Sequence, residues 1–166
     1  MNKIIIKDNF LNKTTFTSIR DTMFDAPGSV FPWFLQSFKV NKRDNQMQFT
    51  HVFYYNNSIN SNYFNTLQPI LNKIKVKALY RIKANITFKT NKVIPYEYHT
   101  DFNNGDVVGK VGVFYLHTTN GPTFFKNGKK VNCVENRMVI FPSNIEHTGS
   151  THTDSKIRGV INFNWF

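Results

Sequence analysis

The second half of the chain alternates apolar and polar residues with a period of two, which is the pattern of half-buried β-strands. The longest alternating runs are 79–88, 111–117 and 158–166, all rich in β-branched and aromatic residues. Shorter runs cover 97–102, 123–125, 130–134, 137–141 and 145–151, with Asn127-Gly128 as a hairpin turn between two of them. Short strands separated by Gly, Pro and Asn at this spacing predict a β-sandwich or a β-barrel.

The first half combines one strand-like run with two stretches of helical periodicity. The run 48–55 predicts a strand, whereas apolar residues recur at helical spacing in 14–24 and in 61–75. Pro69 lies inside the second stretch, where it conflicts with a continuous helix. We therefore expect helices that precede the β-rich region in sequence and pack outside it.

Length and composition fit a small protein with an apolar core. The chain has 166 residues, of which 40% are apolar, and no apolar run approaches the roughly 18 residues that a membrane-spanning helix needs. The single cysteine, Cys133, excludes an internal disulfide and a cysteine-based zinc site. A lone cysteine also favours a reduced, cytoplasmic compartment, which would be that of the host if the protein is viral.

The net charge is +11, from 21 basic and 10 acidic residues. A basic chain is suited to nucleic acid, an anionic small molecule or an acidic partner, and the charge alone leaves these open. The basic residues are scattered, and the densest group is Lys73, Lys75, Lys77, Arg81 and Lys83. The position of this group relative to a catalytic site would discriminate a nucleic-acid substrate from the others.

Candidate metal chemistry begins at His99-Thr100-Asp101. Residues i and i+2 of a strand point to the same face, so this imidazole and this carboxylate can reach one ion. His147 lies on a later strand-like run and supplies a second imidazole. Two histidines and one carboxylate form the facial triad of non-haem Fe(II) oxygenases, which leaves positions open for a co-substrate and O2. Arg158 follows, and a guanidinium can bind a carboxylate through two parallel hydrogen bonds.

Other residues compete for these roles. His152 is the alternative third ligand, and Arg81 and Arg137 are the alternatives to Arg158. The aromatic pair 33–34 either lines the mouth of a substrate site or packs an N-terminal segment onto the barrel. The residues expected to be packed, on the surface or in loops are His51, His117, Asp106 and Asp154.

With these residues in view, the stretch 79–166 resembles the 2-oxoglutarate- and Fe(II)-dependent oxygenases, in particular the small prolyl-4-hydroxylase-like members of phages and bacteria. The segments that carry the resemblance are 99–101, 111–125, 135–142, 147–149 and 158–163. One departure is Gly121-Pro122, where many relatives have Gly-Gly. The resemblance implies a mainly β double-stranded β-helix (jelly roll) with flanking N-terminal α-helices. We expect one oxygenase domain, with helices and a flanking strand in 1–77 and the jelly-roll core in 78–166.

The resemblance also implies residue roles. His99, Asp101 and His147 would bind Fe(II), and Arg158 would bind the distal carboxylate of the co-substrate 2-oxoglutarate. Tyr115 and Asn85 are further candidates for holding this co-substrate. The expected reaction uses O2 to hydroxylate an unactivated C–H bond, with succinate and CO2 as co-products.

The substrate favoured by the resemblance is a protein or peptide side chain such as proline. Two alternatives remain at this stage. One is an oxidative demethylase or hydroxylase of nucleic acid from the same superfamily, and the other is a non-catalytic jelly-roll binding or virion protein. Specificity would lie in the loops about 25–47, 89–97 and 102–109.

Overall fold

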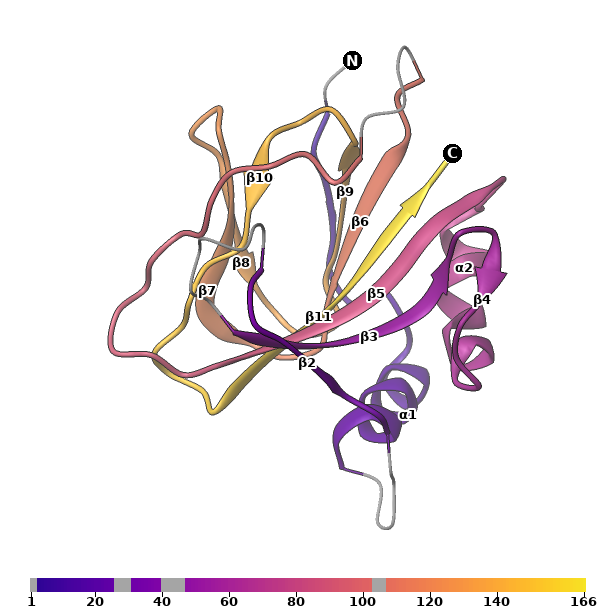
Figure 1. Cartoon of the computed structure of the whole chain (residues 1–166), viewed down its shortest axis with the longest axis horizontal. Helices are drawn as coiled ribbons and strands as arrows, with labels where there is room; N and C mark the ends of the chain where they lie inside the picture. The colour runs from indigo at the N-terminus through magenta and orange to yellow at the C-terminus, as the bar shows by residue number, and fades with distance from the viewer. Residues whose placement is uncertain (1–2, 26–30, 40–46, 103–106) are drawn as a thin grey trace.

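The computed structural model describes residues 3–25, 31–39, 47–102 and 107–166. Two antiparallel sheets make up most of it (Figure 1). The large sheet has the order β1-β9-β6-β11-β5-β3-β2, with β4 paired to β3, and the small sheet has the order β10-β7-β8. The strands of the large sheet are β1 (Ile5–Lys7), β2 (Phe34–Gln36), β3 (Gln48–Tyr55), β4 (Ser58–Ile59), β5 (Leu79–Phe88), β6 (Lys110–Tyr115), β9 (Met138–Pro142) and β11 (Ile157–Trp165). The small sheet consists of β7 (Thr119–Phe125), β8 (Lys130–Cys133) and β10 (His147–Thr148).

Most of the predicted strands are present. β3 and β5 have the predicted bounds, and the hairpin β7–β8 turns at Asn127-Gly128, where Gly128 has a φ of 87°. The predicted strand 97–102 is wrong, because this segment pairs only through one isolated bridge, that of His99 with His147. The predicted strand 145–151 shortens to the two residues of β10 for the same reason, since this stretch finds few partners for a regular ladder.

The helices lie where the apolar spacing predicts them. Helix α1 (Lys13–Phe24) begins after Asn12, whose side chain accepts a hydrogen bond from the Thr15 backbone N–H. The second predicted helix divides into a 3-10 turn (Phe64–Leu67) and α2 (Gln68–Ile74). This division removes the conflict at Pro69, because Pro69 occupies the first turn of α2, where a backbone N–H has no partner within the helix. α1, the longest helix in the described part of the chain, has 12 residues and is too short to cross a bilayer.

Alternate residues of the central strands serve two different cores. The outward-facing residues Ile161, Phe163 and Trp165 of β11 pack with Ile82 and Ala84 of β5 and with apolar residues of both helices. Figure 1 shows α1 and α2 on the side of the large sheet away from β7, β8 and β10. The inner core lies between the sheets and joins residues of β6, β9 and β11 to β7 and β8; its buried members are Phe102, Val111, Val113, Tyr115, Phe125, Val131, Cys133, Val139, Phe141 and Val160.

The face of the large sheet that points towards the small sheet is not apolar along its whole length. On β5, the residues that alternate with the outward core are Arg81, Lys83, Asn85 and Thr87, and all four line a cavity between the sheets. They lie in register opposite Asn164, Asn162, Val160 and Arg158 of β11. The period of two therefore places a polar row inside the fold, and this row positions the site described next.

Candidate metal centre

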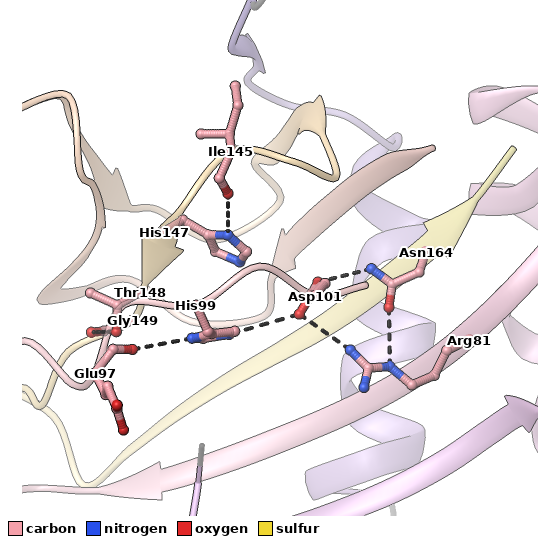
Figure 2. A network of polar contacts seen from close by, with 9 residues as sticks. All are labelled: Arg81, Glu97, His99, Asp101, Ile145, His147, Thr148, Gly149 and Asn164. Carbon is pink, nitrogen blue, oxygen red and sulfur yellow. Dashed lines mark hydrogen bonds and ion pairs between the residues drawn. The ribbon is translucent and has the colours of Figure 1, made fainter. Parts of the chain in front are cut away.

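Three side chains that are separated in sequence meet at one end of the cavity (Figure 2). His99, Asp101 and His147 each offer one ligand atom, and these atoms lie within 4.8 Å of one another. His99 Nε2 and Asp101 Oδ1 lie 3.8 Å apart. Among the residues the structure describes, this is the one group of three or more His, Cys, Asp or Glu side chains so arranged.

The two histidines are fixed by each other's backbone. The His99 N–H donates to the His147 carbonyl at 3.0 Å, and the His147 N–H donates to the His99 carbonyl at 3.0 Å. Each ring also places Nδ1 at 3.1 Å from the carbonyl two residues earlier, Glu97 for His99 and Ile145 for His147. A carbonyl can only accept, so Nδ1 carries the proton and the Nε2 lone pair of each ring is left for a metal.

Asp101 is held by two side chains from neighbouring strands (Figure 2). Arg81 of β5 donates to Oδ1 at 3.2 Å, and Asn164 of β11 donates from Nδ2 to Oδ2 at 2.8 Å. Burial alone would raise the pKa of Asp101, but the charges of His147 and Arg81 and the Asn164 hydrogen bond outweigh it and hold the pKa below its usual value. The carboxylate is therefore ionised, and its remaining lone pairs are available to a cation.

At His147, burial outweighs the neighbouring charges, whereas at Asp101 the charges and the hydrogen bond outweigh burial. Burial lowers the pKa of His147, and the nearby Asp101 charge opposes this shift only in part. The ring packs edge-on against Phe141 with centroids 4.6 Å apart, and it lies beside Phe125. A buried neutral imidazole is the protonation state that binds a metal ion. The donor set is thus two imidazoles, each with Nδ1 against a carbonyl, and one carboxylate.

Arg158 lies at the other end of the cavity, which has a volume of about 300 Å³. Its Nε donates to the Gly121 carbonyl at 2.9 Å, which orients the guanidinium, and its side chain is buried. Among the polar atoms that line the same cavity, Asn85 Oδ1 is buried without a hydrogen-bond partner among the described residues, and the buried hydroxyls of Thr87 and Tyr96 interact at most with each other. Unsatisfied buried polar atoms are costly, so this cluster indicates a polar ligand.

The other predicted site residues take different places. Asn85 lines the cavity with its free Oδ1, whereas the Tyr115 hydroxyl is hydrogen-bonded to Thr123 Oγ1 at 2.7 Å, and burial raises its pKa to about 12. Tyr115 lies beside Arg158, with the guanidinium carbon 5.7 Å from the ring centroid. The predicted role of Tyr115 in holding a co-substrate stays a prediction, with its hydroxyl already engaged.

The competing residues lie elsewhere or act differently. His152 is fully buried and does not join the group of three. Arg137 pairs with Asp8 and donates to the Asn132 carbonyl at 2.9 Å, outside the cavity. Arg81 reaches the cavity but is occupied with Asp101. His51, His117 and Asp154, which the sequence predicts to be packed, surface or loop residues, make contacts of that kind, and Asp106 lies outside the described residues. Of the aromatic pair, Trp33 packs against Phe24, while Phe34 is 62% exposed.

Sequence reasoning missed several residues of this cavity, namely Lys39, Gln48, Lys83, Thr87, Tyr96 and Asn162. The signal that could have found three of them is the polar half of the alternation on 79–88 and 158–166. A polar residue in a strand is usually assigned to solvent, but in a sheet covered on both faces it points into the fold. Tyr96 precedes His99 by three residues and carries no pattern of its own.

No family model and no curated protein sequence matches the chain. Solved structures are similar to it in fold. A prolyl hydroxylase from Trichoplax adhaerens, in complex with a peptide fragment of the hypoxia inducible factor oxygen degradation domain, has a TM-score of 0.72 and 11% identity over 99% of this chain and 84% of its own. An oxidoreductase of the 2-oxoglutarate-Fe(II) oxygenase family from Burkholderia pseudomallei has a TM-score of 0.71 and 10% identity over 98% of this chain and 85% of its own.

A third similar structure performs another reaction. It is the non-haem α-ketoglutarate-dependent epimerase SnoN of nogalamycin biosynthesis, with a TM-score of 0.67 and 9% identity over 99% of this chain and 78% of its own. The chain therefore has the fold of the 2-oxoglutarate- and Fe(II)-dependent oxygenases, and the predicted mainly β jelly roll is confirmed. Because one fold hosts several reactions, the reaction must be argued from the site.

Proposed function

We propose that the chain is an Fe(II)- and 2-oxoglutarate-dependent oxygenase that hydroxylates an unactivated C–H bond. The observation that supports this most directly is the meeting of His99, Asp101 and His147 at one end of a cavity that has Arg158 at the other. Two imidazoles and one carboxylate suit Fe(II), and such a set leaves coordination positions for other ligands. Fe(II) with bound 2-oxoglutarate would supply the oxidising chemistry, which consumes O2 and releases succinate and CO2.

The residues present fit 2-oxoglutarate as well. Arg158 would bind the distal carboxylate, since a guanidinium matches a carboxylate through two parallel hydrogen bonds. The hydroxyls of Thr87 and Tyr96, which line the cavity, would complete the hydrogen bonding of that carboxylate. Asn85, with a free Oδ1, lies between them and the triad along β5. The apolar wall formed by Val113 and Val160 would exclude water from the reacting centre.

A protein or peptide side chain, such as proline, is the substrate class that the resemblance favours, and the prolyl hydroxylase with a bound peptide supports it. The nucleic-acid alternative depends on the basic group 73–83. Lys73 belongs to α2 and contacts the Phe10 carbonyl on the outer side of the sheet, whereas Arg81 and Lys83 line the cavity. These residues thus belong to two different faces, which gives no continuous basic surface for a phosphate backbone.

The test is an anaerobic titration of the protein with Fe(II) and 2-oxoglutarate, followed by visible absorbance. Chelation of the keto acid to Fe(II) produces a weak charge-transfer band, and we expect this band in the natural protein. His99→Ala should abolish it, while His152→Gln, which removes the alternative third ligand, should leave it intact. A folded protein that produces no band would overturn the proposal and favour a non-catalytic jelly-roll binding protein.

A further inference from the structure

The walls of the cavity carry more positive charge than the proposed chemistry uses. Four cationic side chains line it, namely Lys39, Arg81, Lys83 and Arg158, whereas Asp101 is its one carboxylate among the described residues. Arg81 is engaged by Asp101, and Arg158 is assigned to the distal carboxylate of 2-oxoglutarate. Fe(II) and the dianion of 2-oxoglutarate carry equal and opposite charges, so their binding would leave the excess of positive charge in place.

Lys83 is the cation that lacks a partner. It lies on β5 between Arg81 and Asn85, on the face that lines the cavity, and its cross-strand neighbours are Asn162 of β11 and Val52 of β3. Its ammonium makes no hydrogen bond or ion pair with any described residue. Burial and, after it, the Arg81 charge lower its pKa to about 8 against the opposing charge of Asp101. This partly buried ammonium is therefore a positive charge on the cavity wall that is available to an anionic ligand.

The position of Lys83 relates it to the reacting centre. Arg81, two residues before it, contacts the carboxylate of the triad at 3.2 Å. Residues i and i+2 of a strand lie about 7 Å apart on the same face, so the base of Lys83 is one such step from the base of Arg81. Arg158 lies farther along, opposite Thr87. A ligand held by Lys83 would therefore be near the triad and away from the distal-carboxylate end of the cavity.

We propose that the primary substrate carries a carboxylate or phosphate group, which Lys83 binds beside the triad and close to the carbon that is oxidised. This inference rests on the proposed function and names the substrate class of the same site. The cavity of about 300 Å³ must also hold 2-oxoglutarate. The anionic group therefore belongs to a small metabolite or to a side chain that projects into the cavity. Lys39, which also lines the cavity and lies over the Tyr96 ring, would add to the attraction.

The experiment uses the anaerobic protein loaded with Fe(II) and 2-oxoglutarate. Inorganic phosphate and acetate are titrated separately, with acetamide as a neutral control. Binding near the paramagnetic Fe(II) is measured as broadening of the phosphorus resonance of phosphate or of the methyl proton resonance of acetate. We expect saturable broadening by at least one of the two anions, and none by acetamide. The anion that binds more tightly distinguishes a phosphate-bearing substrate from a carboxylate-bearing one.

The variant Lys83→Met should weaken anion binding at least tenfold and change the affinity for 2-oxoglutarate less than twofold, whereas Lys83→Arg should restore anion binding. The matched control is Lys7→Met, which removes an equal charge from the exposed strand β1. Circular dichroism confirms that each variant is folded.

Four results would overturn the inference. Equal anion binding by the natural protein and Lys83→Met, or no anion binding by the natural protein, excludes the assigned role while the charge-transfer band leaves the oxygenase proposal standing. A tenfold loss of 2-oxoglutarate affinity in Lys83→Met would assign Lys83 to the co-substrate instead. Absence of the band in the natural protein would remove the proposed function, and this inference with it.

Discussion

Asn164 and Arg81 are direct cross-strand neighbours in β11 and β5, and Arg81 Nε donates to Asn164 Oδ1 at 3.0 Å. The same two side chains each donate to one oxygen of Asp101. The three residues therefore form a closed ring of hydrogen bonds that fixes the plane of the carboxylate. Partners of this kind, which orient a ligand without touching the metal, are a large part of what determines metal affinity.

Asn164→Leu should weaken Fe(II) binding about 10- to 100-fold, which is the usual cost of losing such a partner. The substitution keeps the charge and approximate volume but leaves Asp101 Oδ2 without its donor. Competition with a chelator of known affinity measures the effect. The control is Asn162→Leu, two residues earlier on the same face of β11, which has no hydrogen bond to Asp101. Equal affinities in the two variants would contradict the role of the ring.

Arg158→Met should weaken 2-oxoglutarate binding about 10- to 100-fold and leave Fe(II) affinity unchanged. The loss follows from the removal of a charge-assisted pair, worth roughly 1.5–3 kcal/mol. Titration of the charge-transfer band with 2-oxoglutarate at saturating Fe(II) measures it, and Arg137→Met, which removes a guanidinium outside the cavity, is the control. An unchanged affinity in Arg158→Met would show that another cation binds the co-substrate.

Asn136→Ala should destabilise the fold by at least about 3 kcal/mol. Asn136 is buried with a φ of 56°, and its side chain accepts from the Leu11 N–H at 2.9 Å and donates to the Leu11 carbonyl at 2.8 Å. Alanine leaves both buried backbone groups without partners and strains the left-handed backbone, at a cost of roughly 1–3 kcal/mol for each group and 1–2 kcal/mol for the strain. Urea unfolding measures the change.

Asn136→Gly separates the two contributions of this residue. Glycine adopts positive φ without strain but makes neither side-chain hydrogen bond. We expect it to be about 1 kcal/mol more stable than the alanine variant and less stable than the natural protein. A glycine variant as stable as the natural protein would mean that the bonds to Leu11 contribute nothing measurable.

Stability should decrease on acidification because of His117. Burial, reinforced by the charges of Arg20 and His152, lowers its pKa to about 4, against about 6.5 in the unfolded chain. The neutral ring accepts the Gly159 N–H on Nδ1 at 3.2 Å and packs edge-on against Phe24. The unfolded state therefore binds a proton first, so the contribution of His117 is complete above about pH 6.5 and is lost as the pH falls towards 4.

Thermal unfolding between pH 4 and pH 8 tests this. The natural protein should lose Tm steadily below about pH 6.5, and His117→Asn, which keeps an acceptor for Gly159 but does not titrate, should lose less over the same interval. Other buried histidines whose pKa is lowered, such as His51, remain in both proteins, so the difference between them isolates His117. Parallel curves would contradict the assignment.

The sequence predicts the strands whose alternation is long and regular. It also predicts the three residues that meet in the candidate metal centre, because His-x-Asp and a later histidine have a chemical meaning together. It does not predict that His99 and Asp101 lie outside a regular strand, because isolated bridges leave no periodic pattern. It also misses β1, because Ile4-Ile5-Ile6 does not alternate apolar with polar residues. This strand pairs with β9 at the edge of the large sheet, and the side chains of Ile5 and Ile6 remain exposed.

The polar lining of the cavity was the larger omission. Lys83, Thr87 and Asn162 follow the same period of two as any solvent-facing residue, and only the second sheet and the segment 89–101 turn that face into an interior. Whether a polar side chain faces water or a cavity depends on what covers the sheet, which is a tertiary property that local sequence does not record.

Strand β11 bears on the size of the molecule that the site accepts. Arg158 and Asn164 lie on the same face of this one strand, about 20 Å apart along its axis at the usual rise per residue. A continuous ladder with β5 sets this separation, and the irregularity between Asn164 and Trp165 begins only beyond it. The strand therefore sets the distance between Arg158 and the side chain that holds Asp101, the two ends between which the proposed co-substrate would bind. One residue inserted between 158 and 164 would lengthen this separation and turn the side chain of Arg158 or of Asn164 away from the cavity. One residue inserted after 164 would leave the separation unchanged.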